Sequence, residues 1–120
     1  MIESLVEQIE ARHAEVQAQM SDPEVIGDRQ RYADAGRQFN QLAPAAKLAE
    51  EWRRATSDAE GAQEMLDEGM EDPELREEMR AARERIEQLA VAIAALDAVL
   101  AVEDPRAAAD EDLVGIEVVA

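Results

Sequence analysis

The sequence predicts an all-α fold: an antiparallel coiled-coil helical hairpin, with two shorter N-terminal helices packed against it. Apolar residues recur at heptad spacing through two long segments of the chain, which is typical of coiled-coil helices. A glycine and a proline separate these two segments. Only one Trp, one Tyr and one Phe occur among 120 residues, a composition that favours packed helices over a β-sandwich.

The N-terminal part predicts two helices, at about residues 2–20 and 28–42. The first carries apolar residues at spacings of three and four, which indicates an amphipathic helix. The second has a weaker apolar stripe and contains Gly36, which disfavours a helix.

A short stretch between these two helices, QMSDPEVIGD at residues 19–28, has the residues of a helix start. Ser21 and Glu24 have the spacing of a capping box, and Pro23 suits a first helical turn because its missing N–H would have no partner there. We interpret this stretch as a joint between helices without ligand chemistry.

The coiled-coil hairpin is predicted from two helices at about residues 45–69 and 73–101. The heptad positions are Ala45, Leu48, Trp52, Ala55, Ala59, Ala62 and Leu66 in the first helix, and Leu75, Met79, Ala82, Ile86, Leu89, Ile93, Leu96 and Leu100 in the second. Pro44 and Pro73 suit helix starts, and Gly69 suits a helix end. Because so few residues separate Gly69 from Pro73, the two helices must fold back on each other.

The predicted tip of the hairpin is strongly acidic. The whole chain has 29 acidic and 12 basic residues and a net charge of −17, which argues against bulk nucleic-acid binding. We predict that a basic partner protein binds the tip through four acidic residues, Glu64, Asp67, Glu68 and Glu71. One alternative is a solvated corner without a partner. The other is that two tip carboxylates hold Mg²⁺ inside another macromolecular complex, as in the coiled-coil cleavage factors of RNA polymerase.

The chain offers little for catalysis, so we predict no enzyme activity, no cofactor and no metal site. It has no Cys and one His, and His13 lies on the apolar stripe of the first helix, where packing is the expected role. Glu10 and His13 have the Glu-x-x-His spacing of di-iron bundles, but such a site needs a second His.

Two further features concern location and the chain end. The longest apolar run, Leu89 to Leu96, is too short to span a membrane, and the N-terminus lacks the features of a signal peptide, so a cytoplasmic protein is expected. Residues 103–120 have the composition of a linker followed by a strand. We expect this strand to be the first of a following domain that is missing from the chain.

Several motifs, taken in order, resemble the N-terminal domain of bacterial class I peptide chain release factors, more closely the release factor 1 type than type 2. These motifs are Arg12-His13-Ala14-Glu15 to Met20, Ser21-Asp22-Pro23-Glu24 to Asp28, Arg31-Tyr32, Arg37, Leu42-Ala43-Pro44, Ala62 to Leu66, Asp72-Pro73-Glu74-Leu75-Arg76-Glu77, Glu103-Asp104-Pro105 and Ile116 to Ala120. The resemblance covers essentially the whole chain. One departure is Val119, which stands where the family's Glu-Ile-Arg-Ala-Gly has Arg.

The resemblance implies a role in translation termination at stop codons. In that family the first domain is a helical bundle that positions the factor on the ribosome near the stalk base, and it is implicated in the action of the recycling GTPase release factor. The family's Gly-Gly-Gln loop and its codon-reading Pro-x-Thr element are missing from this chain. The alternative is a standalone acidic coiled-coil adaptor, or a hairpin factor that enters the channel of RNA polymerase.

Overall fold

The computed structural model describes residues 2–103, which form four α-helices and contain no strand. The helices are α1 (Ile2–Ser21), α2 (Pro23–Ile26), α3 (Arg29–Asp67) and α4 (Pro73–Glu103). The all-α prediction is therefore confirmed for this part of the chain. The expected strand of the C-terminal tail lies outside the described residues.

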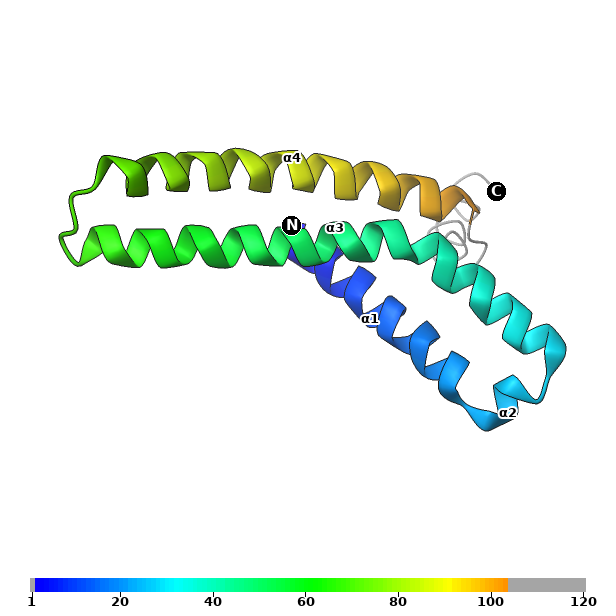
Figure 1. Ribbon diagram of the computed structural model, residues 1–120. Coiled ribbons are helices and arrows are strands. Elements are labelled where there is room, and N and C mark those ends of the chain that lie inside the picture. Colours follow the sequence, from blue (N-terminus) through cyan, green and yellow to red (C-terminus); the bar gives the residue numbers. More distant parts are fainter. Residues whose placement is uncertain (1, 104–120) are drawn as a thin grey trace.

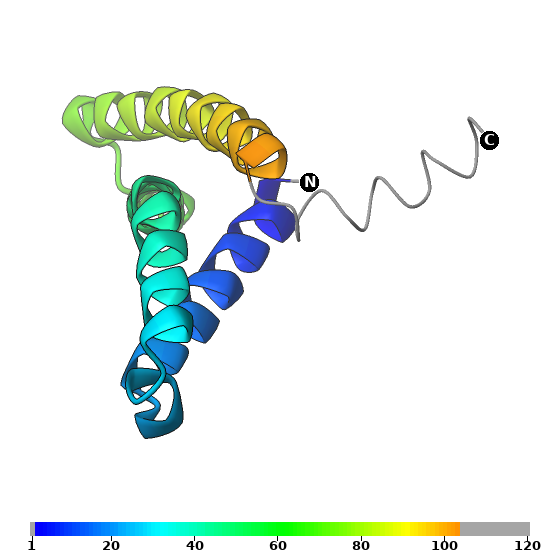
Figure 2. The same ribbon diagram turned by 90° about the vertical axis from the view of Figure 1, so that its right-hand side faces the viewer.

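Two long helices, α3 and α4, run antiparallel and form the predicted hairpin (Figure 1). The helix α1 lies along the N-terminal half of α3, and its own N-terminus meets the middle of the hairpin (Figures 1 and 2). The Cα radius of gyration is 18.9 Å and the extents are 58 × 42 × 18 Å. Because a compact domain of this size would have a radius of gyration of about 13 Å, the molecule is elongated and flat.

The predicted break in the chain at Pro44 is wrong. The sequence predicts separate helices at 28–42 and 45–69, whereas α3 is a single helix of 39 residues with Pro44 inside it. Proline removes one backbone hydrogen bond and strains the preceding turn. Pro44 is exposed, and Leu42 and Ala45 beside it are buried, so the ring points to solvent while the opposite face of α3 stays packed. The helix accommodates the proline by bending, as Figure 1 shows where the ribbon of α3 passes from cyan to green.

The joint at residues 19–28 contains one short helix, α2, and its cap differs from the prediction. Asp22 is the N-cap, because its Oδ1 accepts a hydrogen bond from the Glu24 backbone N–H at 3.0 Å. Ser21 ends α1 instead and donates its hydroxyl to the Gln17 carbonyl at 3.2 Å. Val25 in α2 is only 3 % exposed. The joint is thus an ordered corner held by its own cap and one buried side chain.

The main core lies where α1 meets the hairpin. Its buried members are Val6, Ile9, Ala45, Ala49, Trp52, Ala55, Leu89 and Ile93. The small alanines come from α3 and the larger Leu and Ile from α4, as the heptad rows predict, and this pairing lets the two helices approach closely. Ala49 is absent from the predicted row, yet it is fully buried in this cluster, which also includes Val6 and Ile9 of α1.

A second, smaller core lies near the tip of the hairpin. It consists of Ala62 from α3 with Leu75 and Met79 from α4, and Leu66 packs against it. These four positions all belong to the predicted heptad rows. The hairpin is therefore held by one cluster at its base and another near its tip.

Candidate partner-binding surface

The tip of the hairpin is built by a tight helix end followed at once by a helix start. Gly69 has φ of 95°, a left-handed conformation that glycine adopts without the steric cost of a Cβ. The Gly69 N–H donates to the Leu66 carbonyl at 3.0 Å, and the Met70 N–H donates to the Met65 carbonyl at 3.1 Å. This is a Schellman motif, which satisfies carbonyls that the end of α3 would otherwise leave unpaired.

The start of α4 is fixed by Asp72 and Pro73. The Asp72 Oδ1 accepts a hydrogen bond from the Glu74 backbone N–H at 3.0 Å, and its carbonyl accepts one from Arg76 N–H at 3.2 Å. Pro73 occupies the first helical position, where proline is favoured. The Asp72 carboxylate is thus engaged in capping, which leaves the neighbouring acidic residues to form the outer surface of the tip.

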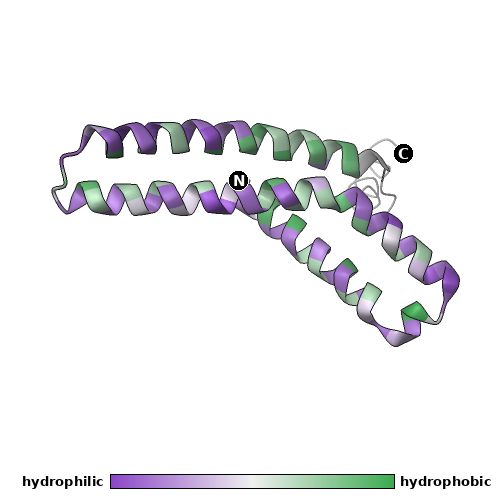
Figure 3. Cartoon of the chain, viewed as in Figure 1, coloured by the Kyte–Doolittle hydropathy of each residue, from purple (hydrophilic) through white to green (hydrophobic). Residues whose placement is uncertain are grey.

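The four predicted partner-binding residues all lie on this end of the hairpin and are exposed. Asp67 is the last residue of α3, Glu64 lies one turn earlier, Glu68 is the C-cap, and Glu71 is in the turn. The structure therefore brings them together at the tip, where Figure 3 shows hydrophilic segments with hydrophobic ones between them. We refer to Glu64, Asp67, Glu68 and Glu71 as the acidic tip.

The carboxylates of the acidic tip differ in how they are engaged. Asp67 accepts a hydrogen bond from Gln63 Nε2 at 2.8 Å, and Glu71 lies 3.3 Å from Arg76 Nη2 with its side chain 83 % exposed. Such an exposed pair is held weakly because water screens it. Glu64 and Glu68 form no side-chain hydrogen bond or ion pair within residues 2–103. Most of the negative charge is therefore free to meet a partner.

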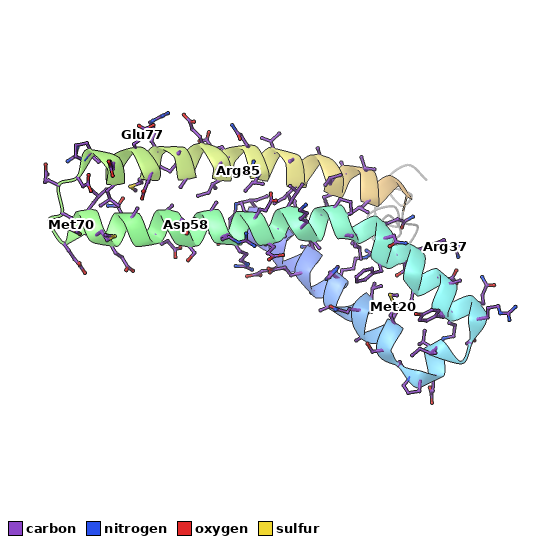
Figure 4. All side chains as sticks on the ribbon, viewed as in Figure 1. Met20, Arg37, Asp58, Met70, Glu77 and Arg85 are labelled. Carbon is purple, nitrogen blue, oxygen red and sulfur yellow. The ribbon has the colours of Figure 1, made fainter. Side chains whose placement is uncertain are left out.

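Two exposed methionines accompany the acidic tip and were not predicted. Met65 in α3 is 40 % exposed, and Met70 in the turn is 49 % exposed; Figure 4 labels Met70 at the turned end of the hairpin. Methionine side chains are flexible and adapt to irregular apolar surfaces. Sequence periodicity could have predicted the exposure of Met65, because this residue falls outside the heptad row. It could not have predicted the exposure of Met70, because the turn has no periodicity.

The residues considered for catalysis and metal binding have structural contacts. Glu10 is bound by Arg53, and the His13 ring packs against Phe39 with 5.0 Å between the ring centroids. The spacing of Glu10 and His13 thus reflects helix packing. Within residues 2–103, no group of three or more Asp, Glu or His side chains is placed to hold a metal ion.

The buried face of α3 contains two polar atoms without a hydrogen-bond partner among the described residues. These are Trp52 Nε1 and Thr56 Oγ1, one helical turn apart. Trp52 is 4 % exposed and belongs to the main core, so it packs inside the domain as the heptad row predicts. It is not an exposed aromatic anchor for a partner.

Comparison with known protein families identifies the family of this chain, which the geometry alone does not. The PCRF domain family matches residues 9–120, which is nearly the whole chain. The chain belongs to the PCRF domain family. This family is the N-terminal domain of class I peptide chain release factors, so the predicted resemblance is confirmed at the level of that class.

The PCRF match relates the chain to translation termination and, in general terms, to the ribosome. The PCRF domain is a non-catalytic part of release factors. No solved structure was found to match the chain. None of the helices in residues 2–103 is long and apolar enough to cross a membrane.

Proposed function

We propose that this PCRF domain positions a release factor of the release factor 1 type on the ribosome during termination at stop codons. The family match over residues 9–120 is the observation that carries this proposal. The type 1 assignment is supported by the order and spacing of the motifs from Arg12 to Pro44 and from Asp72 to Glu77. In the proposed factor the codon-reading and peptide-hydrolysing elements lie outside the PCRF domain, and the factor acts in the cytoplasm of a bacterial cell.

The acidic tip is the proposed contact surface. It lies at the far end of a long hairpin, away from the main core and from α1, so a bound partner would not disturb the packing of the bundle (Figure 1). Its carboxylates are exposed and largely free of cations. A basic protein near the stalk base of the large ribosomal subunit, or the recycling GTPase release factor, would supply complementary charge.

The test is binding of the 120-residue chain to purified bacterial ribosomes, measured by co-sedimentation at two salt concentrations. The variant carries Glu64→Gln, Asp67→Asn, Glu68→Gln and Glu71→Gln. We expect it to bind at least about tenfold more weakly, because charged groups in a complementary interface steer and hold the partner. The loss should shrink as salt rises, since ions screen the same interaction.

A matched control removes the same number of charges elsewhere, through Glu3→Gln, Glu7→Gln, Glu15→Gln and Glu24→Gln. These residues are exposed and lie on α1 and α2, outside the acidic tip. The control should bind as the parent does. Equal losses in both variants would show that only net charge matters, and unchanged binding of the tip variant would overturn the proposed contact.

A further inference from the structure

A groove runs between α3 and α4 in the distal half of the hairpin. Its volume is about 750 Å³. All of its lining residues belong to α3 and α4, so no other described helix covers it. Figure 4 labels Asp58 and Arg85, which line the groove from the two facing helices. We call this feature the hairpin groove.

Five small apolar residues from both helices line the hairpin groove, and we call them its floor. These are Ala55, Gly61, Ala62, Ala81 and Ala82. A floor of this kind allows the ridges of another helix to come close, since its own side chains are short. At its outer end the groove is bordered by Met65 and Leu75, which give it an apolar lining.

Gly61 leaves part of the α3 side of the hairpin groove without a side chain. A glycine in a helix interior destabilises the helix by roughly 0.5–1 kcal/mol relative to alanine. At Gly61 an added Cβ would meet no atom within 4 Å, so nothing within the hairpin requires a glycine at this position. The missing side chain keeps the floor clear for an approaching chain.

The charged residues that line the hairpin groove favour a positively charged partner. Asp58 and Glu78 line it from opposite helices, and neither forms a side-chain hydrogen bond or ion pair within residues 2–103. The one lining cation, Arg85, is held by Glu51 at 3.0 Å. The groove therefore presents an apolar floor between two unneutralised carboxylates, which complements an apolar stripe flanked by Lys or Arg.

We propose that the hairpin groove binds a basic amphipathic α-helix of a partner protein. The apolar stripe of that helix would lie on the alanine and glycine floor, and its flanking cations would reach Asp58 and Glu78. Helices recognise apolar grooves through residues at spacings of three and four. This inference goes beyond the proposed function and does not depend on it, because it concerns a surface other than the acidic tip.

The first experiment titrates the ¹⁵N-labelled 120-residue chain with a synthetic Leu–Lys peptide of about 18 residues, whose leucines follow helical spacing. A permuted peptide of identical composition, without the apolar stripe, controls for attraction to the net charge of −17. We expect amide shift changes concentrated at residues 55–65 and 75–85, and at least about tenfold weaker binding of the permuted peptide. Equal binding of both peptides, or shift changes confined to other regions, would overturn the proposal.

The second experiment fills the floor with Gly61→Leu and compares it with Gly36→Leu. Both glycines lie inside α3 and have open space where a Cβ would be, so the substitutions are matched in their effect on the helix. Gly61→Leu should weaken peptide binding by about tenfold or more, whereas Gly36→Leu should leave it within about twofold. Thermal unfolding of each variant is the check that it is folded. Parent-like binding by Gly61→Leu would contradict the inference.

A third variant tests the charge of the groove without filling it. The double substitution Asp58→Asn and Glu78→Gln keeps side-chain size and should weaken peptide binding by about three- to tenfold at low salt. Ribosome binding by this variant should match that of the parent, since the acidic tip is intact. The acidic-tip variant should lose ribosome binding and keep normal peptide binding, whereas the double variant at Asp58 and Glu78 should lose peptide binding and keep ribosome binding. This pattern would show that the two surfaces bind independently.

Discussion

Glu10 and Arg53 connect α1 to the hairpin through a two-point ion pair. Arg53 Nη2 donates to Glu10 Oε1 at 2.7 Å, and Arg53 Nε donates to Oε2 at 3.0 Å. The geometry matches the planar guanidinium to the carboxylate, which gives orientation as well as attraction. The hydrogen bond from Arg53 lowers the pKa of Glu10, and the positive charge of Arg53 adds to this effect. No local pattern predicts such a pair, because its members lie 43 residues apart.

The Glu10 pair predicts a pH-dependent effect of Glu10→Gln. Because the folded-state pKa of Glu10 lies below its unfolded value, the pair stabilises the fold above the unfolded pKa, and this contribution is lost as the pH falls through the folded pKa. The variant should therefore have a Tm lower by about 2 °C near pH 7, and the difference should shrink toward zero as the solution is made acidic enough to protonate Glu10 in the folded state. Glu60→Gln, at an exposed residue of α3 that forms no side-chain hydrogen bond or ion pair within residues 2–103, is the control and should change little at either pH. A difference that persists in acid would show that the pair is not the cause.

At the scale of helices, α3 shows where sequence rules succeed and where they fail. The end of α3 just before Gly69 and the start of α4 at Pro73 were predicted, because a left-handed glycine and a first-turn proline act through local backbone geometry. The same rule predicts a helix break at Pro44, and that prediction is wrong. Packing decides this case, since buried residues continue on the opposite face of α3 from Leu42 to Ala45 and Ala49. Tertiary contacts thus outweigh the local cost of the proline.

Replacing Pro44 should stabilise the protein, because alanine would restore the missing backbone hydrogen bond without changing a buried side chain. A proline in an unstrained helix interior costs about 3 kcal/mol. The bend in α3 already relieves part of this cost, and alanine also increases the entropy of the unfolded chain, so we expect Pro44→Ala to raise the free energy of unfolding by about 1 kcal/mol. Urea denaturation followed by circular dichroism measures the change. Pro73→Ala, at a first helical position, is the control and should give no gain; a less stable Pro44→Ala would mean that the bend itself supports the packing of α1.

At the scale of the whole molecule, the heptad rows and the acidic run together predicted both the hairpin and the position of its charged end. What the sequence could not predict was the hairpin groove, which needs both helices in place. The groove arises from how α3 and α4 face each other, whereas the acidic tip follows from position along the chain alone. The acidic tip was therefore predictable, because a single turn defines it. The hairpin groove was not, because two helices form it.

The excess of negative charge predicts that added salt stabilises this protein. With 29 acidic and 12 basic residues, repulsion between carboxylates outweighs the attraction of the surface ion pairs, which are individually weak. Raising NaCl from about 20 mM to about 500 mM shortens the screening length to a few ångströms, so the Tm of the parent should rise by several degrees. The acidic-tip variant, which lacks four of these charges, should show a smaller rise, whereas the Glu10→Gln variant should rise nearly as the parent does. A Tm that falls with salt in the parent would mean that the ion pairs, among them those of Arg53 and Arg80, contribute more to stability than repulsion removes.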